Sequence, residues 1–115
     1  MEKKIAPVIE KVYDAILWFL PKLDQFPRSQ KFLLGDRIET MLLDILELLI
    51  EANYSRSRRE ILSRANLKLD KLRFLMRISK DMRYIDLKAF EYQARLVDEI
   101  GRMVGGWQKS HMANR

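Results

Sequence analysis

Cysteine is absent from the 115-residue sequence, and histidine occurs once, at His111. Without thiols the chain can form no disulfide, thiolate metal cluster or cysteine nucleophile, and one histidine leaves too few ligands for a zinc site. We therefore expect no metal ion or other cofactor, and the composition favours a reducing, cytoplasmic environment.

Long apolar runs are also missing. No stretch approaches the ~18 apolar residues of a membrane-spanning helix, and the N-terminal residues lack the apolar core of a signal peptide. Glycine and proline are scarce, at 4 and 3 residues, so few positions favour turns. We expect a soluble protein without a membrane partner, folded as one domain over residues 1–115.

Patterns that support catalysis are weak. General acid–base chemistry needs a carboxylate pair or a histidine within reach of a partner, and His111 lies in a polar C-terminal segment. Glu47 and Glu51 share a helical face, but the Glu-x-x-His motif of di-metal bundles does not occur in the sequence. We expect a protein that is not an enzyme.

Apolar residues recur at helical spacing in four segments, and no segment shows the alternation of a strand. We expect helices over about 6–23, 28–53, 57–82 and 86–105, each about 30 Å long. Because the connections are short, neighbouring helices should be antiparallel. The prediction is an all-α protein, an antiparallel up-down-up-down four-helix bundle.

Local signals mark the helix ends. Pro21 should end or bend the first helix, and Asp86 should cap the fourth. Ser57 and Glu60 have the spacing of a capping box at the start of the third helix. Gly105-Gly106 is expected to end the fourth helix, since glycine favours the position after a helix, and the polar residues that follow should fray.

Three helices carry apolar residues on a second face, away from the stripe expected to face the core. A lone bundle would expose this second face to water, so self-association is the favoured interpretation. The alternative is a wide core with ordinary exposed apolar residues. The expected subunit-interface residues are Leu43, Leu46, Ile50, Leu67, Phe74, Ile78, Leu96, Ile100, Met103 and Trp107.

Positive charge is concentrated between Tyr54 and Tyr84. This segment has ten basic and three acidic residues, a net of +7, whereas the rest of the chain has 12 basic and 13 acidic residues. Basic ridges along a helix match a phosphate backbone. The expected nucleic-acid-binding residues are Arg56, Arg58, Arg59, Arg64, Lys68, Lys71, Arg73, Arg77, Lys80 and Arg83.

Other partners for this basic segment remain open. An acidic protein could bind it, and a membrane surface ranks last because the cations straddle the stripe that the core needs. The segment could also be an ordinary solvated face whose cations pair with carboxylates of the preceding helix. Those carboxylates are Asp36, Glu39, Asp44, Glu47 and Glu51.

Two stretches resemble a known family. Residues 26–38 read FPRSQKFLLGDRI, and residues 100–107 read IGRMVGGW. They resemble the accessory variability determinant (Avd) proteins of diversity-generating retroelements, which lie within a four-helix-bundle family that includes proteins encoded in ribosomal RNA intervening sequences.

The resemblance implies a homopentameric barrel that binds RNA or DNA and the reverse transcriptase of the same element. Such a protein supports mutagenic copying of template RNA into cDNA and has no catalysis of its own. The alternative is an intervening-sequence-type interaction module without a reverse transcriptase partner. Within the motif, Phe26 and Phe32 would anchor on the core, Gly35 would allow close approach of a neighbour, and Arg37 would bond to the adjacent helix.

Overall fold

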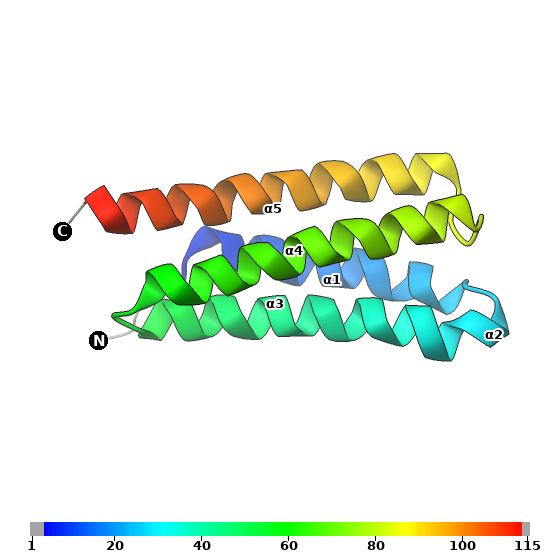
Figure 1. Cartoon of the computed structure of the whole chain (residues 1–115), viewed down its shortest axis with the longest axis horizontal. Coiled ribbons are helices and arrows are strands. Elements are labelled where there is room, and N and C mark those ends of the chain that lie inside the picture. The colour runs from blue at the N-terminus through cyan, green and yellow to red at the C-terminus, as the bar shows by residue number, and fades with distance from the viewer. Residues whose placement is uncertain (1–3, 114–115) are drawn as a thin grey trace.

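The computed structural model describes residues 4–113, which form four long antiparallel helices (Figure 1). These are α1 (Pro7–Asp24), α3 (Asp36–Tyr54), α4 (Arg58–Asp81) and α5 (Leu87–Ala113). No strand occurs among the described residues, so the all-α prediction is confirmed. The bundle measures 47 × 24 × 19 Å. None of the described helices has both the length and the apolar character to cross a membrane.

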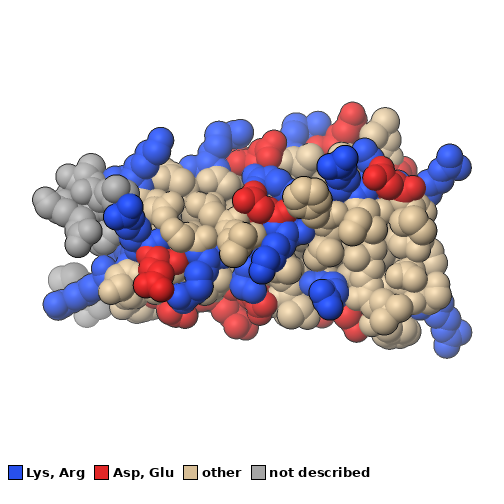
Figure 2. All heavy atoms as spheres, viewed as in Figure 1, with Lys and Arg blue, Asp and Glu red and all other residues tan. Residues whose placement is uncertain are grey.

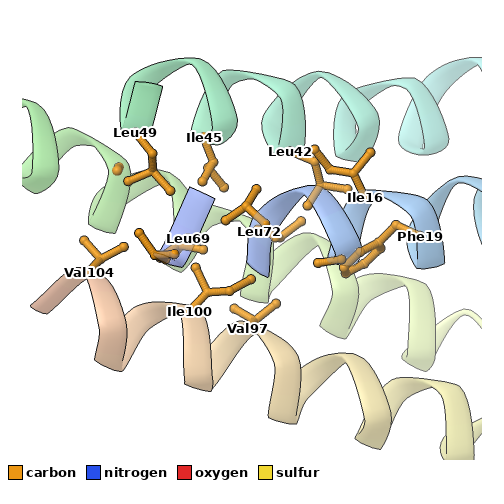
Figure 3. Close-up of a cluster of buried hydrophobic side chains, with 14 of the residues drawn as sticks. Ile16, Phe19, Leu42, Ile45, Leu49, Leu69, Leu72, Val97, Ile100 and Val104 are labelled. Atoms are coloured by element: carbon orange, nitrogen blue, oxygen red, sulfur yellow. The ribbon is translucent and has the colours of Figure 1, made fainter. Parts of the chain in front are cut away.

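All four helices contribute to one core (Figure 3). α1 packs mainly on α3 and α5, and α4 packs on the same two helices, so α1 and α4 lie at diagonal corners. The stripe predicted for α4 is buried from Ile61 to Met76, as expected. Side chains that point toward one another in Figure 3 include Ile16, Phe19, Leu42, Ile45, Leu49, Leu69, Leu72, Val97, Ile100 and Val104.

The start of α1 is tied to the end of α3. Pro7 opens the helix, where its missing N–H costs nothing. The Ala6 N–H donates to Asn53 Oδ1 at 3.0 Å, and Asn53 Nδ2 donates to the Lys4 carbonyl at 3.2 Å. Pro21 lies inside α1, which continues to Asp24. The helix therefore does not end at this proline, and its last residue lies one position beyond the predicted end at residue 23.

The second predicted helix is interrupted by a wider turn. It begins as α2 (Arg28–Gln30), passes through a π-helical turn (Lys31–Gly35) and continues as α3. Phe26 is buried, as the resemblance implied, but Phe32 is 65% exposed. Because the π-helical turn projects Phe32 outward with Leu33, the expectation that Phe32 anchors on the core was wrong.

Two other motif residues also differ from expectation. A Cβ added at Gly35 would lie no closer than 3.7 Å to its nearest neighbour, the Gln30 carbonyl oxygen, which is ordinary contact. Close approach therefore does not require glycine there. Arg37 is exposed and makes no hydrogen bond or ion pair with a described residue.

The C-terminal end of α3 is capped by Arg58, the first residue of α4. The Ser57 side chain makes no capping bond, so the predicted capping box is wrong. Arg58 Nε instead donates to the carbonyls of Ala52 at 2.9 Å and Ser55 at 3.1 Å, which lie at the end of α3. At α5 the prediction is confirmed, because Asp86 Oδ1 accepts the N–H of residue 89 at 2.7 Å.

The α4–α5 connection is a Schellman turn. The Tyr84 N–H donates to the Ser79 carbonyl at 2.8 Å, and the Arg83 N–H donates to the Lys80 carbonyl at 2.9 Å. Arg83 has a φ of 63°, in the left-handed region where glycine is usual.

At its other end, α5 extends past the position predicted for its C-terminus. The helix passes through Gly105-Gly106 and runs to Ala113, so the predicted end was wrong. The polar residues expected to fray are helical as far as Ala113. The side chain of His111 and residues 114–115 lie outside the described part.

Candidate nucleic-acid interface

On the side of α4 that faces α3, two of the predicted cations are paired. Arg64 lies 3.7 Å from Glu51 of α3 and 3.8 Å from Glu60 of its own helix. Lys68 lies 3.5 Å from Asp44 of α3. These are partly exposed pairs, which contribute about 1 kcal/mol or less each. The alternative of a solvated, charge-paired face therefore holds for this edge.

On the side of α4 that faces α5, Arg73 forms ion pairs with two carboxylates. Its guanidinium lies 2.7 Å from Asp70 and 3.3 Å from Asp98 of α5. Lys80 lies 3.7 Å from Asp81. Arg73 thus bridges two helices, a structural role that partly satisfies its charge.

Arg58 is also held in place. Besides its two bonds to α3 carbonyls, its guanidinium lies over the Trp107 ring of α5 at 5.9 Å. This arginine fastens the α3–α4 connection to α5. The sequence-based assignment of Arg58 to a nucleic-acid surface therefore has a structural alternative.

The other five predicted cations are exposed and form no ion pair with a described residue. Arg56 and Arg59 lie at the α3–α4 connection, Lys71 and Arg77 along the middle of α4, and Arg83 in the turn to α5. The ten predicted residues thus occupy both edges and both ends of α4. They do not form one continuous patch.

A second row of cations, which the sequence reasoning missed, runs along α5. Lys88, Arg95, Arg102 and Lys109 recur every seventh residue, are exposed and form no ion pair with any described residue. Their spacing along the helix is about 10 Å. Figure 2 shows Lys and Arg side chains at intervals along the upper edge, where Figure 1 places α5. This set is called the α5 row.

Carboxylates on α5 lower the net charge of this helix, so a count of charge along the sequence does not indicate the row. Asp98 and Glu99 are on the same helix, but both are held sideways, by Arg73 at 3.3 Å and by Lys11 of α1 at 3.0 Å. Both therefore lie toward the neighbouring helices. The third carboxylate of α5, Glu91, is exposed between Lys88 and Arg95, so the outward face is most basic from Arg95 to Lys109. The recurrence of Lys or Arg every seventh residue was the signal in the sequence that could have found it.

The predicted interface residues fall into three groups. Leu43, Ile50, Leu67, Phe74 and Ile78 are exposed. Figure 2 shows a broad uncharged area on the half of the visible face nearer the α4–α5 connection.

The remaining interface candidates are partly or fully covered. Leu46, Leu96, Met103 and Trp107 pack partly buried against the core. Met103 and Trp107 also line an open pocket of about 550 Å³ between the start of α1 and the end of α5. Ile100 is only 2% exposed and belongs to the core, so its assignment to an interface was wrong. It is buried because α5 packs against both α1 and α4, which covers a wider arc than one stripe.

Comparison with known protein families gives a match. The model of the bAvd-like family matches residues 3–111, nearly the whole chain. No curated protein matches the sequence. The match covers both stretches on which the resemblance rested, residues 26–38 and residues 100–107. The chain therefore belongs to the bAvd-like family of Avd proteins, the accessory proteins of diversity-generating retroelements.

Proposed function

We propose that this protein is a non-enzymatic accessory factor that binds nucleic acid and the reverse transcriptase of its retroelement. In this role it supports mutagenic copying of template RNA into cDNA. The α5 row is the single observation that carries the nucleic-acid part of the proposal. Four exposed cations with no described carboxylate partner form a line about 32 Å long on one rigid helix.

Such a row suits a phosphate backbone more than a particular base sequence. Lys and Arg side chains that neutralise phosphates release counterions, so binding depends strongly on salt and weakly on sequence. Arg95 and Arg102, at the centre of the row, can each contact a phosphate through two N–H groups. Arg56, Arg59 and Arg83, which lie near the ends of α4 and pair with no described carboxylate, would extend the basic surface toward the ends of the bundle.

The proposed assembly is a homopentamer. Five chains with a net charge of +6 each carry +30 on one particle, which strengthens attraction of a polyanion. The exposed apolar residues of α1, α3 and α4 support self-association, since monomeric proteins seldom expose such surfaces.

Charge reversal on the α5 row tests nucleic-acid binding. We expect Arg95→Glu combined with Arg102→Glu to weaken binding of single-stranded RNA or DNA at least tenfold in fluorescence anisotropy. The matched control is Arg28→Glu with Arg37→Glu, which changes net charge equally at the α2 end of the bundle. Equal losses in the two variants would show that total charge matters and that the α5 row is no site.

The reverse transcriptase partner rests on family membership and is tested separately. The protein should co-purify with the reverse transcriptase encoded by the same element, and the mass of the complex should give the stoichiometry. The second candidate, a protein-interaction module without a polymerase, is favoured by the exposed Phe32 and Leu33 in the π-helical turn. Failure to co-purify would favour that candidate.

A further inference from the structure

The outer face of α4 carries an apolar line. Leu67, Phe74 and Ile78 are 55%, 63% and 47% exposed. Their spacing places them on the side of the helix opposite the buried stripe, over a length of about 17 Å.

An unpaired cation lies on each side of this line. Lys71 follows Lys68 by one turn, on the edge where Lys68 pairs with α3. Arg77 follows Arg73 by one turn, on the edge where Arg73 pairs with α5. Both Lys71 and Arg77 are exposed and form no ion pair with described residues. We call Leu67, Lys71, Phe74, Arg77 and Ile78 the α4 outer face.

A second apolar surface lies on the other side of the molecule, where α1 meets α3. On α1, the side toward α5 is marked by the Lys11–Glu99 ion pair and the Trp18–Tyr92 ring contact. On α3, the side toward α4 is marked by the pairs to Lys68 and Arg64. Exposed or half-buried apolar residues also occur on the sides of α1 and α3 that lie away from these contacts. They are Tyr13, Leu17, Leu20, Leu43, Leu46 and Ile50.

These six residues, called the α1–α3 seam, lie at matching heights. The hydrogen bond between Ala6 and Asn53 sets the register of the two antiparallel helices. Counting inward equally from that bond places Tyr13 beside Leu46 and Leu17 close to Leu43. The seam therefore forms one strip, about as long as the apolar line on α4.

Carboxylates border the seam on both helices. Glu10 and Asp14 lie one turn from Tyr13 and Leu17 on α1. Glu39 and Glu47 lie one turn on either side of Leu43 on α3. All four carboxylates are exposed and form no ion pair with a described residue. The seam thus matches the α4 outer face in apolar character and opposes its two unpaired cations in charge. The exposed carboxylates of α4, Glu60, Asp70 and Asp81, are each paired with a cation of the same helix.

We infer that copies of this chain contact one another head to tail, with the α4 outer face of one subunit packed on the α1–α3 seam of the next. This inference rests on the proposed homo-oligomer and specifies its contact. Lys71 and Arg77 pair with seam carboxylates of the neighbour, and Phe74 packs into the apolar strip. A contact between two different patches can repeat around a closed ring.

Symmetric alternatives are disfavoured by charge. Two α4 outer faces would bring Lys71 and Arg77 against the same cations of the partner, and two seams would bring carboxylates together. Like charges in contact disfavour such pairs. The head-to-tail contact also covers α4 and leaves the α5 row open, so the middle cations of α4 serve assembly and the α5 row serves nucleic acid.

A charge swap with rescue tests the contact in the full-length chain. We expect Lys71→Glu with Arg77→Glu to reduce the particle mass in light scattering from five times 13.8 kDa toward a single chain. Asp14→Lys with Glu47→Lys should do the same. Combining all four substitutions restores opposite charges across every contact, so the original mass should return.

The outcomes separate this inference from the proposed function. A wild-type assembly whose mass neither swap changes would overturn the contact and leave the proposed pentamer standing. A monomeric wild type would overturn both. The double variant of Arg95 and Arg102 is the control, because it should keep the assembly mass while losing nucleic acid. Circular dichroism of each swap variant distinguishes dissociation from unfolding.

Discussion

Arg83 adopts a backbone conformation that is unfavourable for a residue with a Cβ atom. Its φ of 63° lies in the left-handed region, which costs a residue with a Cβ about 1 kcal/mol relative to glycine. The Schellman bonds from Arg83 and Tyr84 hold it there. We expect Arg83→Gly to raise the free energy of unfolding by about 0.5–1 kcal/mol in urea titrations. Arg83→Ala, which keeps the Cβ, should give no comparable gain.

Arg58 shows how a basic residue can be structural. Its Nε satisfies two carbonyls at the end of α3, and its guanidinium stacks on Trp107. Lysine keeps the charge but cannot reproduce this planar fork. We expect Arg58→Lys to lower the free energy of unfolding by about 1–2 kcal/mol, measured by urea denaturation. Arg56→Lys, at an exposed neighbour that pairs with no described residue, should change the free energy of unfolding little, and equal effects would contradict the capping role.

At the scale of whole elements, α5 is longer than its glycines suggested. Gly105 and Gly106 lie within the helix, and a Cβ added at either would meet no atom within 4 Å. At Gly101 an added Cβ would lie 3.0 Å from the Arg73 guanidinium. Because alanine favours a helix over glycine by about 1 kcal/mol, we expect Gly106→Ala to raise the melting temperature by several degrees. Gly101→Ala should raise it less, and a loss at Gly106 would show that the helix ends there in solution.

The helices show which features the sequence could predict. In α4 charged residues separate the stripe from Ile61 to Met76 from the apolar line on the outer face, and helical spacing alone predicted which of the two is buried. In α5 two apolar arcs compete, and spacing could not show that Ile100 is buried while Leu87 is 61% exposed. That choice depends on packing against α1 and α4 together, which is a property of the tertiary structure.

Contacts between distant residues explain the other errors. Ser57 has the local spacing of a capping box, but Arg58 reaches back to α3 and supplies the bonds at that junction. The α5 row was missed because Glu91, Asp98 and Glu99 nearly balance it in a count of charge, although Asp98 and Glu99 are held by neighbouring helices. Sequence patterns predicted the elements well, and the partners of charged side chains required the structure.

At the scale of the whole molecule, the number of subunits should appear in the salt dependence of binding. Each phosphate contact contributes about 0.7 to the slope of log affinity against log salt for a single strand. In a ring, every subunit that reaches the strand presents one copy of Arg102. Removing this one side chain from each subunit therefore removes several contacts at once.

We expect Arg102→Gln to reduce that slope by about 0.7 for each engaged subunit, measured by anisotropy over a series of salt concentrations. In the monomeric Lys71→Glu, Arg77→Glu background only one copy of Arg102 is present on each particle. The same substitution should therefore reduce the slope by about 0.7 in total. Arg28→Gln is the matched control and should leave the slope unchanged. An equal reduction by Arg102→Gln in both backgrounds would mean that one subunit binds the strand, because the count of lost contacts would not depend on assembly.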